Sequence, residues 1–185
     1  MRVIAGADRG RRLRAPRGLR TRPTADRVRE TLFDILGPAV AGQRVLDLFA
    51  GTGAVGIEAL SRGATRAVFL ERGREALGAL RANLAALGIP RARARVVAGD
   101  ILSALPRVAR TEEPFDLVFV DPPYASRLAR GALEALAESP LLFSGTRVVV
   151  QHSVRTELPP RVGALVAERT RRVGDTALTF FRADP

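Results

Sequence analysis

From residue 44 onwards, short apolar runs alternate with segments whose apolar residues recur at helical spacing. The segment 74–87 is typical, because its leucines form one stripe and Gly88 follows as a helix terminator. Apolar strands separated by amphipathic helices are typical of a parallel, doubly wound α/β sheet. The predicted strands are 44–49, 66–71, 94–100, 115–121 and 147–152, and the predicted helices are 54–62, 74–87, 101–109 and 128–137.

The last part of the chain departs from this alternation. Residues 165–173 and 176–182 have the pattern of two strands around a Gly-Asp turn, which predicts an antiparallel hairpin at the end of the sheet. Together with the five strands above, this predicts a seven-stranded, mostly parallel sheet with a C-terminal antiparallel hairpin.

The first part of the chain predicts a basic extension of this sheet. Residues 2–14 have the pattern of two short strands around a glycine-bounded turn, and residues 16–23 that of an extended linker. A helix follows over residues 24–36, with Thr24 as its N-cap and a Gly-Pro pair after its end. We therefore expect an N-terminal basic β-hairpin plus a helix.

Composition narrows the class of protein. The chain has 185 residues, of which 46% are hydrophobic, and this suits one domain with a proper core. It contains no Cys and one His, which excludes disulfides, cysteine-based zinc sites and thiol nucleophiles. No apolar stretch approaches membrane-spanning length, and Arg2, Asp8 and Arg9 interrupt any signal-like segment. We expect a soluble, cytoplasmic protein without a metal.

The net charge of +11 is concentrated near the N-terminus. Ten arginines and three acids fall within residues 1–30. Such a block favours a polyanionic partner, because each phosphate contact releases counterions. A solvated basic tail without a partner explains the same block, so the charge alone leaves both interpretations open.

The segment 45–56 carries the first chemical motif, an apolar strand that runs into a glycine-rich turn and a helix. Gly51, Gly53 and Gly56 let the backbone turn tightly and approach a ligand, which also fits a dinucleotide fingerprint. Asp47 argues against a dinucleotide, since a carboxylate at the carboxyl edge of the strand repels a pyrophosphate and attracts an ammonium or sulfonium group. The motif therefore favours S-adenosylmethionine over NAD.

Four of the predicted strands end at or near an acid, and ligands of open parallel sheets lie outside this edge. Glu71 can accept hydrogen bonds from both hydroxyls of a ribose. Asp100 can accept one from an adenine amine, with Ile101 packed on the ring, or it can cap the helix that follows. The four acids are Asp47, Glu71, Asp100 and Asp121.

Asp121-Pro122-Pro123-Tyr124 is the most specific motif in the chain. Two prolines fix the backbone and remove two N–H donors, so a carboxylate, rigid carbonyl oxygens and an aromatic ring arrive together in one loop. These groups can accept both N–H bonds of a planar exocyclic amine, whose lone pair is then free to attack a sulfonium methyl group. Most of the rate would come from positioning and desolvation, with the carboxylate taking the proton. The alternative is a proline-stiffened turn with a packing Tyr.

The glycine-rich turn and the motif at 121–124 together resemble the amino-methylating branch of class I S-adenosylmethionine-dependent methyltransferases, which act on adenine N6, cytosine N4 or guanine N2. Residues 2–6, 9–13, 22–33 and 174–180 resemble the bacterial 16S ribosomal RNA guanine-N2 methyltransferase family. The resemblance implies a Rossmann-like class I fold and transfer of a methyl group from S-adenosylmethionine, with S-adenosylhomocysteine as product. The implied substrate is one guanine in an exposed loop of 16S rRNA on the 30S subunit, where a loop base can be splayed out and stacked.

The resemblance also implies an RNA-binding extension over residues 1–37 and a catalytic domain over residues 38–185, in a single compact monomer. The cofactor would be held by Asp47, Phe49, Ala50, Gly51, Thr52, Gly53, Glu71, Arg72, Asp100 and Ile101. The catalytic group that holds the target guanine would be Asp121, Pro122, Pro123 and Tyr124. The rRNA would be held by Arg9, Arg11, Arg12, Thr24, Arg27 and Arg29.

One position departs from the family pattern, because Gln151 stands where a Glu is expected before His152. His152 is expected to be a hydrogen-bonded residue at a strand end rather than a proton carrier. Three rival functions stay open. A DNA adenine-N6 or cytosine-N4 methyltransferase shares all the chemistry, a non-catalytic RNA-binding assembly factor shares the fold, and an NAD-dependent oxidoreductase shares the glycine-rich turn.

Overall fold

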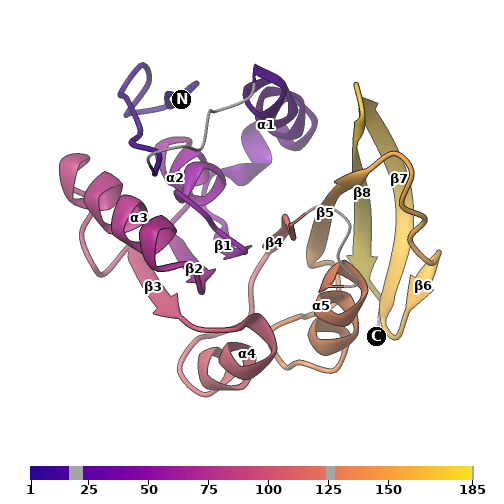
Figure 1. The fold of residues 1–185 in the computed structure, drawn as a ribbon. Helices are drawn as coiled ribbons and strands as arrows, with labels where there is room; N and C mark the ends of the chain where they lie inside the picture. The colour runs from indigo at the N-terminus through magenta and orange to yellow at the C-terminus, as the bar shows by residue number, and fades with distance from the viewer. Residues whose placement is uncertain (17–22, 124–127, 185) are drawn as a thin grey trace.

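The computed structural model describes residues 1–16, 23–123 and 128–184, without the side chains of residues 23–25. Its centre is one eight-stranded sheet with the order β3-β2-β1-β4-β5-β8-β7-β6 (Figure 1). Strands β1 to β5 are parallel, and β8, β7 and β6 continue the sheet in antiparallel pairs. The strands are β1 Arg44–Leu48, β2 Arg66–Glu71, β3 Ala94–Ala98, β4 Leu117–Val120, β5 Arg147–Ser153, β6 Arg161–Val162, β7 Leu165–Val173 and β8 Thr176–Ala183.

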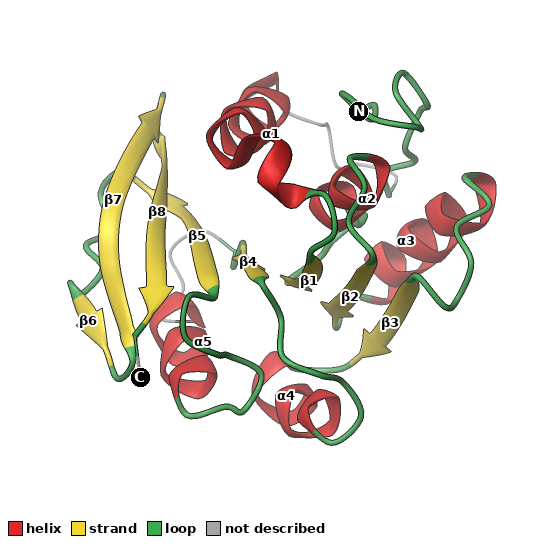
Figure 2. Ribbon diagram, turned by 180° about the vertical axis from the view of Figure 1, so that it is seen from behind, coloured by secondary structure: helices red, strands yellow, loops and turns green. Residues whose placement is uncertain are grey.

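Helices cover both faces of the sheet (Figure 2). Alternate residues of one strand face opposite layers, so Leu117 and Phe119 of β4 pack with α1, α2 and α3, whereas Val118 and Val120 pack with α4 and α5. The helices are α1 Pro23–Leu36, α2 Ala54–Ser61, α3 Arg74–Ala86, α4 Ile101–Ala109 and α5 Leu128–Ala137, with a short 3₁₀ helix η1 Gly37–Val40 after α1.

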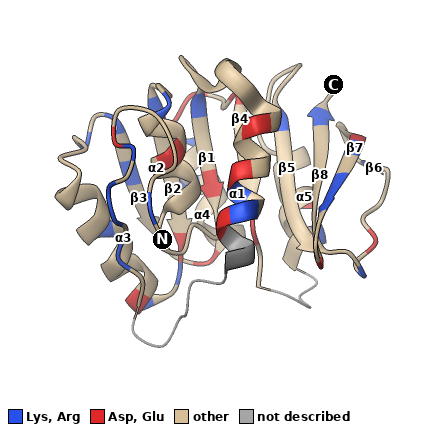
Figure 3. Cartoon of the chain, turned by 90° about the horizontal axis from the view of Figure 1, so that it is seen from above, with Lys and Arg blue, Asp and Glu red and all other residues tan. Residues whose placement is uncertain are grey.

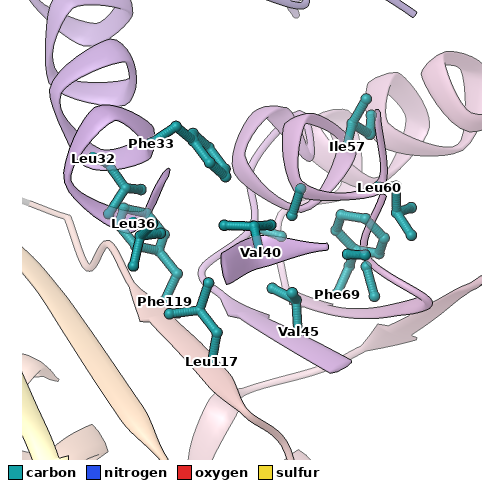
Figure 4. Packing of buried hydrophobic residues seen from close by; sticks show 14 of the residues in the cluster. Leu32, Phe33, Leu36, Val40, Val45, Ile57, Leu60, Phe69, Leu117 and Phe119 are labelled. Atoms are coloured by element: carbon teal, nitrogen blue, oxygen red, sulfur yellow. The ribbon is translucent and has the colours of Figure 1, made fainter. Parts of the chain in front are cut away.

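Helix α1 shares the core of the parallel sheet (Figure 4). Phe33 of α1 is fully buried, and Leu36 and Val40 pack beside it over Phe119 of β4. Burial of a side chain of this size stabilises the fold by about 1.5–3 kcal/mol. This packing fixes the helix of the N-terminal extension above the centre of the sheet.

The structure corrects the sequence prediction at three places. The sheet has an eighth strand, β6, which spans two residues and is too short to show periodicity. The N-terminal hairpin is present as antiparallel pairing, but only as a single bridge between Arg2 and Arg12 rather than two strands. Helix α1 begins at Pro23, so Thr24 lies within its first turn and is not its N-cap. Most of the predicted 16–23 linker lies outside the described residues.

A cluster of charges joins the amino ends of three parallel strands. Glu112 precedes β4, its side chain is 2% exposed, and it accepts hydrogen bonds from Arg66 (Nε, 2.7 Å), Arg44 (Nη2, 3.0 Å) and Arg95 (Nη1, 3.0 Å). Burial alone would raise the pKa of Glu112, but the hydrogen bonds from Arg66, Arg95 and Arg44 lower it to about 2. We call these four residues the amino-edge cluster. Figure 3 marks the basic residues of the described parts of the chain in blue and the acidic ones in red.

No helix among the described residues is both long enough and apolar enough to cross a membrane.

Candidate active site

The predicted glycine-rich turn lies between β1 and α2, at the carboxyl edge of the sheet, and we call residues 49–53 the glycine loop. Phe49, Gly51 and Gly53 have φ angles of 61°, 55° and 80°. A positive φ is rare for a bulky residue, so Phe49 carries backbone strain of the kind found at ligand sites. The N–H of Gly53 donates to the carbonyl of Ala50 (2.7 Å) and closes the turn.

The glycines of this motif have different roles. A Cβ on Gly53 would lie 2.3 Å from Leu80, and one on Gly56 would lie 2.3 Å from Phe69. A Cβ on Gly51 would meet no atom closer than 4.0 Å. Gly53 and Gly56 therefore allow close packing inside the protein, and only Gly51 leaves open space in front of the loop, where a ligand can approach.

Asp47 lies in β1 beneath the glycine loop and is 2% exposed. Its Oδ2 accepts a hydrogen bond from the N–H of Gly56 (2.9 Å), which ties the strand to the first turn of α2. Burial raises the pKa of Asp47 to about 7, against the hydrogen bond from Gly56, and the charges of Asp121 and Glu71 raise it further.

Glu71 joins the glycine loop to the end of β2. Its Oε2 accepts a hydrogen bond from the N–H of Gly51 (2.8 Å), and its Oε1 accepts from the N–H groups of Arg72 (2.8 Å) and Gly73 (2.7 Å). The sequence pattern predicts that Glu71 faces a ribose. The structure places its carboxylate beside the loop and gives it a further role in holding the shape of the loop.

Asp100 caps helix α4, as the alternative interpretation predicted. Its Oδ1 accepts a hydrogen bond from the N–H of Leu102 (3.0 Å). Its Oδ2 lies 3.9 Å from Nη1 of Arg72, and both side chains are at least half exposed. Ile101, the first residue of α4, is buried in the core layer that α4 and α5 form against the sheet. Asp100 and Arg72 thus lie at the exposed rim of the site, next to the loop that Glu71 holds.

Asp121 leaves β4 next to the glycine loop. Leu48 and Val120 are paired across β1 and β4, and the N–H of Asp121 donates to the carbonyl of Leu48 (3.3 Å). Burial raises the pKa of Asp121 to about 7. Pro122 is buried and Pro123 is exposed, whereas Tyr124 lies outside the described residues.

The two acids with raised pKa values define the chemistry of this edge. Asp47 and Asp121 interact electrostatically, and none of the ion pairs of the described residues involves either of them. Two carboxylates that have raised pKa values, and that form no ion pair with a described residue, favour a ligand that itself carries positive charge. The donor set therefore fits S-adenosylmethionine, which carries both a sulfonium and an ammonium group.

The residues predicted to bind rRNA separate into two groups. Arg9, Arg11 and Arg12 are exposed on the N-terminal segment, and Arg27 is exposed on α1. The prediction for Arg29 is wrong. This side chain is 4% exposed, its Nη2 donates to a backbone carbonyl of the N-terminal segment (2.6 Å), and it forms an ion pair with a neighbouring acid of α1. Its guanidinium is therefore committed to holding the fold together. The side chain of Thr24 lies outside the described residues.

We call residues 1–14 the N-terminal arm, and buried side chains of α2 hold it in place. The carboxylate of Glu58 is 0% exposed and accepts hydrogen bonds from the N–H groups of Ile4 (2.7 Å) and Ala5 (3.0 Å). Ser61 Oγ donates to the carbonyl of Ala5 (2.6 Å) and accepts from the N–H of Asp8 (3.0 Å). Sequence reasoning missed both residues, although a Glu within the apolar sequence of α2 is a signal for a buried polar contact.

His152 lies at the end of β5, as predicted. Its Nε2 lies 2.8 Å from Oγ1 of Thr179, and its Nδ1 lies 2.9 Å from the carbonyl of Ser153. Burial lowers the pKa of His152, which keeps the ring neutral and within this network. The prediction of a hydrogen-bonded residue at a strand end is confirmed.

This sheet order, with the glycine loop at the carboxyl edge of β1, is the Rossmann-like fold of class I methyltransferases. The family described as "Conserved hypothetical protein 95" matches residues 1–182, and the chain belongs to that family. The family resemblance found in the sequence is confirmed.

Named relatives and solved structures match over nearly the full length. The ribosomal RNA small subunit methyltransferase D of Escherichia coli K12 is 36% identical over 100% of this chain and 90% of its own. The protein of the same name from Haemophilus influenzae is 36% identical over 92% and 88%. The structure of yhhF from Escherichia coli matches with a TM-score of 0.86 and 38% identity, over 100% and 98% of the two chains. The structure of a hypothetical protein from Thermus thermophilus matches with a TM-score of 0.83 and 35% identity, over 99% of each chain.

Proposed function

We propose that this protein transfers the methyl group of S-adenosylmethionine to the exocyclic N2 amine of one guanine in 16S rRNA, on the 30S particle. The small-subunit rRNA methyltransferases among its relatives support the class of reaction and of substrate. The observation that carries the proposal is the position of Asp121-Pro122 at the end of β4, directly beside the glycine loop. The target base and the methyl donor would meet at this point.

The residues around the glycine loop would hold the cofactor. S-adenosylmethionine, when bound, supplies a methyl group on a positively charged sulfur. Asp47, when ionised, would stabilise the positive charge of the ligand, and that charge would in turn lower the pKa that burial raises. The open space in front of Gly51 would receive the nucleoside, and Glu71 would accept hydrogen bonds from the ribose through lone pairs that the loop N–H groups leave free. Asp100 and Arg72, at the rim, would contact the adenine.

Asp121 would prepare the amine for attack. The guanine N2 lone pair is delocalised into the ring, and hydrogen bonds from its two N–H groups, one to Asp121 and one to the carbonyl of Pro122, would favour a more tetrahedral nitrogen. The lone pair would then form the N–C bond as the C–S bond breaks with its electrons on sulfur, and the carboxylate of Asp121 would accept the N–H proton. A carboxyl group with a pKa of about 7 is suited to accept a proton at neutral pH. Tyr124 as a stacking ring remains a prediction.

The N-terminal extension, residues 1–37, would bind the rRNA backbone. Arg9, Arg11 and Arg12 are exposed on the N-terminal arm and Arg27 is exposed on α1, so all four can reach phosphates. We propose that the remaining residues, 38–185, form the catalytic domain of a monomer.

The deciding experiment is the transfer of labelled methyl groups to 30S subunits that lack the modification, followed by mass analysis of nucleosides. The expected product is N2-methylguanosine. N6-methyladenosine or N4-methylcytidine would contradict the proposed specificity, and transfer to genomic DNA instead of rRNA would establish the DNA-methylating rival. Stabilisation by NADH but not by S-adenosylhomocysteine in a thermal-shift assay would establish an oxidoreductase. Binding of rRNA without any transfer would establish an assembly factor.

A further inference from the structure

Asn83 lies on α3, between the glycine loop and the N-terminal arm, and is 1% exposed. Its amide makes three hydrogen bonds, all to backbone groups. Oδ1 accepts from the N–H of Arg14 (2.7 Å), and Nδ2 donates to the carbonyls of Arg14 (3.1 Å) and Thr52 (3.0 Å). One buried side chain therefore touches the arm and the glycine loop at the same time.

The contact with Thr52 fixes the orientation of one peptide plane in the glycine loop. The carbonyl of Thr52 accepts from Asn83, and the N–H of Gly53, which belongs to the same peptide, donates to Ala50 (2.7 Å). Because a peptide is planar, its two ends cannot turn independently. Any change in the position of the Asn83 amide therefore acts on the loop in front of which the cofactor would lie.

The contact with Arg14 fixes the end of the N-terminal arm. Asn83 takes both backbone hydrogen-bonding groups of Arg14, and the side chain of the preceding Leu13 is buried in the core. The exposed arginines Arg11 and Arg12 come directly before these two residues. A phosphate bound by Arg11 and Arg12 therefore restricts the position of Arg14, the residue that Asn83 holds.

We propose that Asn83 is a positioning residue that couples the binding of RNA by the arm to the binding of S-adenosylmethionine by the glycine loop. This inference rests on the proposed function and adds to it a link between the two substrates. RNA on the arm holds Arg14, and through it the Asn83 amide, in the orientation that fixes the Thr52–Gly53 peptide. By linkage, each ligand then strengthens the binding of the other by the same factor.

The test measures the affinity of the full-length protein for S-adenosylhomocysteine by calorimetry, without and with unmodified 30S subunits. In the wild type, the subunits should tighten S-adenosylhomocysteine binding. Asn83→Asp keeps an acceptor for the N–H of Arg14 but loses the donor to the carbonyls of Arg14 and Thr52, so it should weaken S-adenosylhomocysteine binding about tenfold and abolish the effect of the subunits. Asn83→Ala should also abolish the effect of the subunits on S-adenosylhomocysteine binding.

Ser61→Ala is the matched control, because Ser61 anchors the arm to α2 and makes no contact with the glycine loop. It should leave the affinity of the free protein for S-adenosylhomocysteine within about twofold of wild type, although it weakens the arm. A purely structural role of Asn83 predicts instead that all three variants lower the melting temperature and keep the wild-type enhancement by 30S subunits. That result would overturn the inference.

A measurement on the wild type keeps the inference testable if the Asn83 variants do not fold. S-adenosylhomocysteine alone should slow hydrogen exchange at the N–H of Arg14, since that group is bonded to Asn83. An unchanged exchange rate at Arg14 in a protein that binds S-adenosylhomocysteine would overturn the coupling. If the wild type binds no S-adenosylhomocysteine at all, the proposed function itself fails.

Discussion

Carboxylates at the two edges of the parallel sheet have opposite surroundings and opposite pKa shifts. At the amino edge, Glu112 accepts hydrogen bonds from three arginines, and its pKa is lowered to about 2. At the carboxyl edge, Asp47 and Asp121 have pKa values raised to about 7, and none of the ion pairs in the described parts of the chain includes them. The same kind of side chain is paired with arginines at one edge and has no ion pair with a described residue at the other.

This difference separates stability from function within one sheet. A carboxylate surrounded by guanidinium groups is already paired, and removing it leaves those charges uncompensated and destabilises the fold. A buried carboxylate without a cation destabilises the free protein and gains a partner only when a cationic ligand binds. The comparison predicts that removing a carboxylate at the amino edge lowers stability, whereas removing one at the carboxyl edge impairs the reaction without lowering stability.

The largest expected effect is that of Asp121→Asn on the reaction. The substitution removes the proton acceptor and keeps the shape of the side chain, so kcat should fall by about 10²–10⁴-fold, as expected for a general base. Single-turnover methyl transfer to unmodified 30S subunits measures the change. Affinity for S-adenosylhomocysteine should change little, since this ligand lacks the sulfonium charge and the proposed contact of Asp121 is with the target amine.

Asp175→Asn is the matched control, because Asp175 is an exposed acid in the turn between β7 and β8. The control should keep the wild-type rate. A rate for Asp121→Asn within a few-fold of wild type would show that Asp121 is a structural residue.

The next largest effect is that of Glu112→Gln on stability. The substitution leaves three arginines without their shared acceptor and should lower the free energy of unfolding by about 2–3 kcal/mol. This is less than for a fully buried pair, because the arginines are 23–35% exposed. Urea denaturation measures the loss.

The adjacent Glu113 offers a control for this loss. Its side chain is 84% exposed and lies 3.8 Å from Arg44, so Glu113→Gln should change the free energy of unfolding by no more than about 0.5 kcal/mol. The two variants remove the same charge from neighbouring positions. Equal losses would mean that net charge, and not the buried cluster, determines stability at the amino edge.

Much of the carboxyl edge could be predicted from the sequence, because it depends on local motifs. The acid in β1, the glycines after it and the Asp-Pro-Pro motif after β4 are each contiguous, and the alternating pattern places them at one edge. The helix cap predicted for Asp100 is confirmed, since a cap needs only the N–H groups of the next residues, and its contact with adenine stays a prediction. The role of Gly53 was missed, because it depends on Leu80 of another helix.

The amino edge and the arm could not be predicted, because their contacts join distant positions. Glu112 binds arginines 17 to 68 residues away, and Asn83 binds residues 31 and 69 away. The error at Arg29 has the same origin. An Arg in a basic, helical segment indicates an exposed face, and only the folded arm shows that this guanidinium is covered.

The third prediction concerns the pH dependence of the reaction. Asp121 must be ionised to accept a proton, so kcat should rise about tenfold between about pH 6 and pH 8 and then level off. In Asp121→Asn this rise should disappear from the residual kcat. A wild-type rate that is constant from about pH 5 to pH 8 would contradict the role of the raised pKa.

The last prediction is a gain in stability for Asp47→Asn, and it has a definite pH dependence. The pKa of Asp47 is raised from 3.8 in the unfolded chain to about 7 in the folded protein, so its favourable contribution is fully present below about pH 4 and is lost as the pH rises through 7. Asn can still accept the hydrogen bond from Gly56 and carries no charge to desolvate. The melting temperature of Asp47→Asn should therefore exceed that of wild type by a growing margin from pH 4 to pH 8.

Glu112 has the opposite pH dependence. Its pKa is lowered, so its contribution to stability is lost as the pH falls from about 4.5 to about 2. If both variants shifted stability in the same pH range, the contrast between the two edges would be wrong.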